Sequence, residues 1–324
     1  MHNIIQTLLT SEDPATRYKV RAKVIGAGKP EAKTLALQRE IKNSPVVSTL
    51  LLERNAAGEI PWHPYDKWAG AHWALSLLAD LDFPPGDEAL IPLREQVYGW
   101  ILSERHKAYF PKRFVAGRMR MHPSQEGNVI YYLIKLGLAT DAIEELVARL
   151  LDWQWPDGGW NCDMNPDAGV SSFTETLIPL RGLIHYQQYS GNPKIAPAIE
   201  QAAEVFLRRQ LFKRLRDGAV IDRNFVALHY PCYWHYDILF ALKVMAEAGF
   251  IDDPRCAAAL DLLETKGLPD GGFPAEARYY RLTDDPKAGG RSTVDWGGTG
   301  KKKMNEFVSA DALYVLKAAG RLHV

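Results

Sequence analysis

The feature that most constrains the fold is a repeating pattern of two kinds of helix. From Tyr65 onward, a loop rich in Gly, Trp or Pro leads into an apolar helix, a short turn and a more amphipathic charged helix before the next loop. Such a period is typical of repeat architectures, in which each unit buries its apolar face against its neighbours. Apolar helices are predicted over 68–81, 126–138, 173–186, 234–248 and 308–319, and charged helices over 88–104, 141–153, 193–213 and 254–266.

The two classes of helix differ in how their apolar residues are distributed. The apolar helices are hydrophobic almost all round, whereas the charged helices carry a single apolar stripe. Strict alternation of the two classes predicts an all-α fold, an α/α toroid or barrel of inner and outer helices with loops that converge over a central cavity. Residues 1–58, with helices predicted over 15–25, 35–42 and 45–54, are expected to close the ring, and residues 59–324 to form the helix-pair repeats of one domain. Residues 220–226 are expected to form a short extended piece.

Composition and charge exclude several classes of function. Lysine plus arginine and aspartate plus glutamate both number 39, so there is no overall basic field to attract nucleic acid. The longest apolar stretches fall well short of the roughly 20 residues of a membrane span, so no transmembrane segment is expected, although peripheral membrane contact stays open. The three cysteines are far apart and no secretory signal begins the chain, so a cytoplasmic location is predicted.

Residues 150–160, Leu-Leu-Asp-Trp-Gln-Trp-Pro-Asp-Gly-Gly-Trp, carry a resemblance to a known family. They match the leucine, glutamine, glycine and tryptophan spacing of the QW motif of squalene and oxidosqualene cyclases, with degenerate copies at 263–273 and 206–218. The resemblance covers about 60–320 and implies the α/α toroid shared with protein prenyltransferases, in which Gln154 and Trp160 would be structural. It also implies an enzyme that acts on a hydrophobic or terpenoid-like small molecule by acid/base chemistry such as cyclisation, isomerisation or dehydration.

Departures from the family keep other functions open. The Asp-x-Asp-Asp acid motif of squalene cyclases is absent and the chain is about half as long as a two-domain triterpene cyclase, so polycyclisation of squalene is not expected. A non-catalytic isoprenoid- or lipid-binding protein fits these departures equally well. A third reading, an α/α-barrel carbohydrate enzyme, would need a carboxylate pair such as Glu126 with Asp237, and the QW motif argues against it.

The richest candidate site is the segment 229–237, His-Tyr-Pro-Cys-Tyr-Trp-His-Tyr-Asp. In a toroid the starts of the inner helices surround the pocket, and Cys232 and His235 would share a helical face there. Asp237 is predicted either to orient His235 as an acid/base pair or to act itself. The alternative is an aromatic helix start whose histidine and aspartate satisfy backbone groups.

The remaining candidates also stand near starts of inner helices. Asp163 should lie over the cavity mouth, Glu175 either faces inward or caps its helix, and Arg118 and Arg120 either bind a carboxylate or phosphate or form surface ion pairs. Asp311 is predicted to occupy the place that Asp237 has in its own repeat. The predicted catalytic residues are Asp237, His235, Glu175, Asp163, Glu126 and Asp311, and the predicted substrate-binding residues are Trp68, His72, Trp73, Arg118, Arg120, His122, Cys232, Tyr233, Trp234 and Tyr236.

No cofactor is expected from the residues themselves. The resemblance to prenyltransferase β subunits, which hold zinc with aspartate, cysteine and histidine, raises the alternative of zinc at Cys232 and His235, with Asp163 or Cys162 as a further ligand. No compact Cys/His spacing completes that ligand set.

Overall fold

The computed structural model describes residues 2–26, 32–285 and 287–322, and these are mostly helical, as predicted. One set of helices forms the interior: α2 (Pro14–Lys19) with its continuation η1 (Val20–Ile25), α5 (Ala71–Asp80), α9 (Pro123–Lys135), α11 (Phe173–Ser190), α13 (Ile238–Glu247) and α15 (Glu306–Ala318). A second set lies outside them: α1 (His2–Leu9), α3 (Ala32–Lys42), α4 (Pro45–Leu50), α6 (Ile91–Ile101), α10 (Ile143–Trp153), α12 (Ala196–Leu207) and α14 (Ala257–Glu264).

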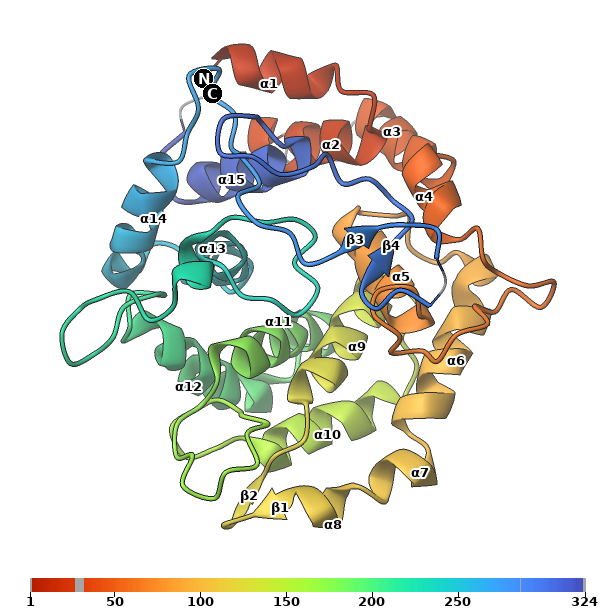
Figure 1. Ribbon diagram of the computed structural model, residues 1–324, viewed down its shortest axis with the longest axis vertical. Coiled ribbons are helices and arrows are strands. Elements are labelled where there is room, and N and C mark those ends of the chain that lie inside the picture. Colours follow the sequence, from red (N-terminus) through yellow and green to blue (C-terminus); the bar gives the residue numbers. More distant parts are fainter. Residues whose placement is uncertain (1, 27–31, 286, 323–324) are drawn as a thin grey trace.

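The interior helices contact one another in chain order. Helix α5 packs on α9, α9 on α11, α11 on α13, α13 on α15, and α15 on α2 and η1. The series returns to its start where Lys23 of η1 pairs with Asp82, just after α5, at 2.7 Å. Most outer helices cover the interior helix that precedes them, as α6 covers α5, α10 covers α9 and α14 covers α13, whereas α1 contacts the α2 that follows it and α4 contacts α3. Figure 1 shows the outer helices around the periphery.

Small elements connect these helices. Short helices α7 (Glu104–Lys107) and α8 (Phe110–Arg113) lead from α6 to an antiparallel pair, β1 (Phe114–Val115) with β2 (Arg118–Met119). A second pair, β3 (Arg281–Leu282) with β4 (Arg291–Ser292), is parallel. Single-turn helices η2 (Glu88–Leu90), η3 (Pro193–Ile195) and η5 (Pro254–Cys256) each precede an outer helix.

Helices α9 and α11 pack closely because both have glycine at the contact. A Cβ atom on Gly182 would lie 2.5 Å from the carbonyl oxygen of Gly127, and one on Gly127 would lie 2.6 Å from Cα of Pro179. Distances below 3.0 Å between such atoms are not tolerated, so only glycine permits this approach. The two helices are therefore aligned backbone to backbone, which fixes how their N-terminal ends sit side by side.

A layer of charged side chains crosses the interior below those N-terminal ends. The buried carboxylate of Asp311 contacts Nζ of Lys19 at 2.5 Å and Nζ of Lys243 at 3.0 Å. The Arg181 guanidinium, also buried, contacts Asp80 at 3.0 Å and Glu247 at 2.8 Å. Charged side chains in ion pairs therefore occupy the interior at this level.

Asp311 does not occupy the place of Asp237, so that prediction is wrong. Asp237 is the N-cap of α13 and accepts a hydrogen bond from the Phe240 amide, while Asn305 is the N-cap of α15 and accepts one from Val308. Asp311 lies six residues inside α15, as Lys243 does inside α13, so the two charges meet at one level.

Other boundaries also differ from the predictions. The helix predicted from residue 234 begins at Ile238, because Asp237 caps it and the aromatic residues before it form a loop. The helix predicted over 193–213 ends at Leu207, and Gln210 and Leu211 have positive φ angles that a helix does not allow. Part of the predicted extended piece is the single-turn helix η4 (Arg223–Val226), capped by Asp222. Helices α1, α7 and α8 and the four short strands were not predicted.

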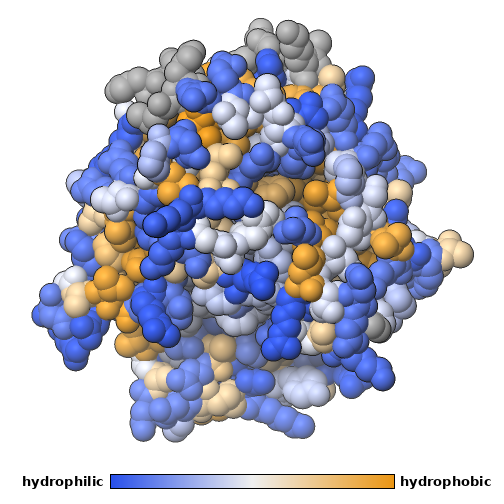
Figure 2. Space-filling view, turned by 45° about the horizontal axis from the view of Figure 1, so that its top comes forward, coloured by the Kyte–Doolittle hydropathy of each residue, from blue (hydrophilic) through white to orange (hydrophobic). Residues whose placement is uncertain are grey.

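Within the described residues, no helix combines the length and apolar character that a membrane crossing requires. Figure 2 shows one face of the molecule, on which hydrophilic residues predominate and hydrophobic ones gather in separate patches. Peripheral contact with a membrane stays a prediction.

Candidate functional site

A pocket of about 420 Å³ lies at the N-terminal ends of α9 and α11. Its lining is Tyr65, Lys67, His122, Ser124, Gln125, Cys162, Ser172, Thr174, Glu175 and Trp234. Two of these residues are aromatic, no lining residue is aliphatic, and the rest carry polar or thiol groups. Such a concave site with converging polar groups is the usual form of a small-molecule site.

The two helices contribute the same three positions to the lining. These are the N-cap, the second and the third residue of each helix, namely His122, Ser124 and Gln125 from α9, and Ser172, Thr174 and Glu175 from α11. The first amides of a helix have no partner within it, so these ends offer donors and a partial positive charge. Both helices therefore direct a region that favours negative charge toward the pocket.

Glu175 occupies that region and links the two helices. Its Oε2 accepts a hydrogen bond from the Ser124 amide at 3.1 Å, and its Oε1 lies 3.3 Å from Nδ1 of His122. The Glu175 side chain is 10% exposed, whereas that of His122 is 39% exposed at the pocket mouth. Glu175 thus faces the pocket, as one of its two predictions had it, while its carboxylate contacts the end of the neighbouring helix α9 and Ser172 caps its own helix.

Cys162 and Tyr65 bring neutral polar groups to the same space. Burial raises the pKa of the Cys162 thiol to about 12, with a further contribution from the charge of Glu175 and a hydrogen bond to it. Burial also raises the pKa of Tyr65 well above its ordinary value, against a smaller opposing effect of a hydrogen bond with Gln125. The donor atoms of His122, Cys162 and Glu175 all lie within 4.8 Å of one another.

Trp234 and Lys67 form the remaining wall. Nζ of Lys67 lies 4.9 Å from the centre of the Trp234 ring, a cation–π geometry. Trp234 stacks on His235 with ring centres 4.0 Å apart, and His235 stacks on Tyr279 at 3.6 Å. Burial lowers the pKa of His235 to about 3, so its ring is neutral and supports Trp234 from behind instead of lining the pocket.

The predicted pair of Asp237 with His235 is not formed. The fully buried carboxylate of Asp237 lies 2.9 Å from Nδ1 of His229 and accepts the backbone N–H of His229 at 2.9 Å. The expected helical face of Cys232 and His235 is also absent, because both residues precede the first turn of α13. The alternative prediction, in which these polar groups satisfy the backbone, describes Asp237 correctly.

Arg120, predicted to bind an anion, is engaged by the protein itself. It is fully buried and donates to the carbonyl oxygens of Asp163 at 2.5 Å, Ala168 at 3.1 Å and Val115 at 3.3 Å. Arg118 lies over the Trp155 ring at 4.8 Å. Arg120 therefore fixes the loop that carries Cys162, and neither arginine lines the pocket.

The two other predicted acids lie apart from the pocket. The carboxylate of Asp163 is exposed and accepts the Asn165 amide at 2.9 Å. Glu126 is fully buried with Arg149 at 3.3 Å and His106 at 3.7 Å. The carboxylate pair of the carbohydrate reading, Glu126 with Asp237, is thus not presented to the pocket.

The other predicted substrate-binding residues are part of the core. Trp68 stacks on Tyr233 with ring centres 3.9 Å apart and meets Trp73 edge-on. His72 lies between Asn128 and Tyr132, both at 3.3 Å, and burial lowers its pKa to about 3. Tyr236 donates to the Leu211 carbonyl at 2.5 Å, and Cys232 is buried. Of the predicted site, the structure brings together His122, Glu175 and Trp234, with Cys162 from the zinc alternative.

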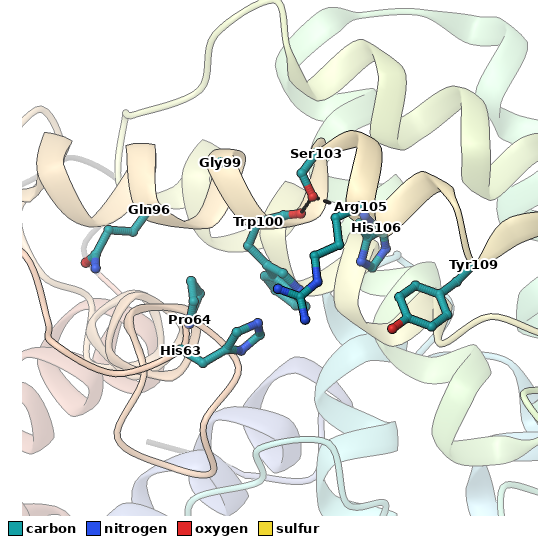
Figure 3. Close-up of a pocket in the computed structure, with 9 residues that line it drawn as sticks. All are labelled: His63, Pro64, Gln96, Gly99, Trp100, Ser103, Arg105, His106 and Tyr109. Atoms are coloured by element: carbon teal, nitrogen blue, oxygen red, sulfur yellow. Dashed lines mark hydrogen bonds between the residues drawn. The ribbon is translucent and has the colours of Figure 1, made fainter.

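A second pocket, of about 520 Å³, lies on the other side of Tyr65. Figure 3 shows Arg105, His106 and Tyr109 reaching it from the α7 region, opposite His63 and Pro64. The Tyr65 and Trp100 rings, with centres 5.4 Å apart, stand between the two pockets. None of the predicted site residues lines this second pocket.

The site residues predicted from the sequence did not include the lining residues Tyr65, Lys67, Ser124, Gln125, Ser172 and Thr174. A usable signal was present, because three of these directly flank a proline or phenylalanine that begins an interior helix. The N-cap, second and third positions of each such helix are the ones to inspect.

Comparisons with known proteins give a distant structural similarity only. No family model matches the chain, and no curated protein matches it. Its structure is similar to that of a protein from Actinoplanes, with 21% identity, a TM-score of 0.46 and coverage of 94% of this chain and 89% of that one. It is also similar to two variants of the type II terpene cyclase MstE from Scytonema in complex with geranylgeranyl dihydroxybenzoate. The first has 16% identity and a TM-score of 0.42, and the match covers 95% of this chain and 87% of that one. The second has 15% identity and a TM-score of 0.26, and the match covers 88% of this chain and 98% of that one. These values transfer no site residue to this chain.

Proposed function

We propose that this chain is an enzyme that binds a small polar molecule in the pocket at the ends of α9 and α11 and performs acid/base chemistry on it. The observation that carries the proposal is the pair of His122 and Glu175, 3.3 Å apart in the wall of a pocket that has no aliphatic lining. A histidine held by a carboxylate is the usual arrangement of a general base.

Each lining residue has a defined part in this chemistry. Glu175 is fixed by the Ser124 amide and accepts Nδ1–H of His122, which leaves Nε2 of His122 to take a proton from the substrate. The neutral hydroxyl of Tyr65 and the amide of Gln125 supply hydrogen bonds that orient polar groups of the substrate. Trp234 supplies one flat face, and Lys67 at the rim attracts negative charge.

The polar side chains that converge on this pocket favour a substrate that carries polar groups to pair with them. The terpenoid-like ligand and the non-catalytic lipid-binding role stay predictions. We further propose that the closed series of helix contacts is that of an α/α toroid and that the chain belongs with the squalene cyclase and prenyltransferase repeat proteins. The contact order of the helices and the spacing around Gln154 support this.

The test is turnover of an unknown substrate from a complex mixture. Purified protein is incubated with a metabolite extract, and depletion and formation of small molecules are followed by mass spectrometry. Glu175→Gln keeps an acceptor for the Ser124 amide but removes the charge, and we expect it to reduce turnover by about 100-fold or more. Glu200→Gln, on the exposed face of α12, is the matched control and should behave as wild type.

Two outcomes would count against the proposal. Equal turnover by Glu175→Gln and wild type would remove the pocket from the chemistry. A tightly bound isoprenoid in native mass spectra, with no conversion of any compound, would replace the enzyme by the lipid-binding alternative.

A further inference from the structure

We propose that His122, Cys162 and Glu175 bind a divalent transition-metal ion, with zinc as the best match. The inference rests on the proposed function in using the same pocket. With an ion bound, His122 and Glu175 would be its ligands, and water on the ion would supply the acid/base chemistry in place of the free His122–Glu175 pair. Within the part of the chain that the structure describes, these three are the one group of three or more His, Cys, Asp or Glu residues whose donor atoms all lie within 4.8 Å of one another.

The distances suit a metal centre after a small adjustment. Donor atoms around tetrahedral zinc, with bonds of about 2.0–2.3 Å, lie roughly 3.3–3.8 Å apart. The His122 and Glu175 atoms are already separated by 3.3 Å, and all three donor atoms lie within 4.8 Å. Cys162 therefore needs to approach by about 1.5 Å at most. It is half-buried in a loop rather than locked in a helix.

The donor set selects the class of ion. One thiolate, one imidazole and one carboxylate are the ligands that zinc and similar transition metals prefer, whereas magnesium and calcium require oxygen donors. A thiolate and a carboxylate also balance the charge of a dication. Three protein ligands beside an open pocket match catalytic zinc sites, in which water or substrate takes the fourth position.

The surroundings hold each ligand in place. The second oxygen of Glu175 is bound by the Ser124 amide, which orients its carboxylate. The loop of Cys162 is fixed on one side by Asn161, which donates to the Val170 carbonyl at 2.8 Å, and on the other by Arg120 on the Asp163 carbonyl. Such outer contacts are what position ligands in known metal sites. Of the residues in the zinc alternative from the sequence, Cys162 belongs to the cluster, whereas Cys232, His235 and Asp163 do not.

The experiment is titration of metal-free protein with Co²⁺ followed by absorption, with Zn²⁺ competition to measure affinity. We expect one ion per chain, the spectrum of a tetrahedral site and a sulfur-to-cobalt charge-transfer band. Cys162→Ser should lose that band and weaken binding by about 100-fold or more. Cys256→Ser, at a buried cysteine that contacts the Phe250 carbonyl far from the pocket, is the matched control and should keep both. Circular dichroism melting establishes that each variant is folded.

Failure of this inference and failure of the proposed function give different results. No Co²⁺ binding by wild type, or unchanged binding by folded Cys162→Ser and His122→Asn, overturns the metal site. Turnover that persists in a chelator also overturns a catalytic ion while leaving the His122–Glu175 pair as the acid/base group. A bound ion with a charge-transfer band but no turnover of any compound supports the metal site and removes the proposed enzyme.

Discussion

Replacing Gly182 by alanine tests whether the close contact of α9 and α11 positions the pocket. The new Cβ would lie 2.5 Å from the Gly127 oxygen and 2.9 Å from its Cα, and both are backbone atoms that cannot rotate away. An ordinary contact needs at least about 3.4 Å, so the helices must separate by roughly 1 Å. Overpacking of this kind costs about 1–3 kcal/mol, against a gain of about 0.5–1 kcal/mol for alanine over glycine in a helix.

The matched control is Gly99→Ala in α6, where a Cβ meets nothing within 4 Å. The same substitution should there raise the free energy of unfolding by about 0.5–1 kcal/mol. Urea unfolding followed by circular dichroism measures both variants, and Co²⁺ affinity reports on the separation of His122 from Glu175. We expect Gly182→Ala to lower stability and weaken Co²⁺ binding. Equal stabilisation by the two substitutions would refute the argument that this contact is tight.

Two other perturbations follow from the buried polar groups. Asp311→Asn leaves the buried Lys19 and Lys243 without their shared carboxylate and should lower the free energy of unfolding by about 3–5 kcal/mol. The control Asp261→Asn removes an exposed carboxylate that pairs with Arg321 and should change that free energy by less than about 1 kcal/mol. Urea unfolding measures both variants, and a small effect of Asp311→Asn would contradict the buried ion layer. His72 has a folded pKa of about 3, below the ordinary value near 6.5, so the unfolded chain binds the proton first and stability falls as the pH drops through 6.5 toward 3. In His72→Gln the slope of unfolding free energy against pH between 6 and 4 should be smaller by about 1.4 kcal/mol per pH unit, and an unchanged slope would contradict the burial effect.

The sequence predicted the interior helices because their signals are local. The cap and proline at Asp13 and Pro14 and the long apolar stretches of α11 and α13 are visible within one helix. The start of α13 was misplaced because Trp234 and Tyr236 fit helical spacing, although the N-cap of Asp237 excludes them from the helix.

The charged layer was not predictable in the same way. Lys19 and Asp311 are 292 positions apart, and nothing in the segment of either residue indicates that it has a buried partner of opposite charge. Only the closure of the helix series shows that they meet. Burial then converts residues that were expected to face solvent or a ligand into structural ion pairs.

The candidate site was predicted in part. Glu175 and His122 were found because they stand at starts of apolar helices, but nothing local shows that these two starts adjoin. That depends on the glycine contact between α9 and α11. Asp237 and Arg120 have side chains that could act in a functional site, but Asp237 caps α13 and Arg120 supports the loop around Asp163. Only hydrogen-bond geometry can tell these structural roles from functional ones.

The lining positions on α9 and α11 end at Gln125 and Glu175, before the close backbone contact at Gly127 and Pro179. Each helix thus lines the pocket with its first turn and makes its tight backbone contact after it. Ligand preference can therefore diverge between related chains by exchange of first-turn residues while the packing beneath stays constant. For protein engineering, variation at Ser124, Gln125 and Thr174 is the place where a library would sample new substrates with little loss of folded protein.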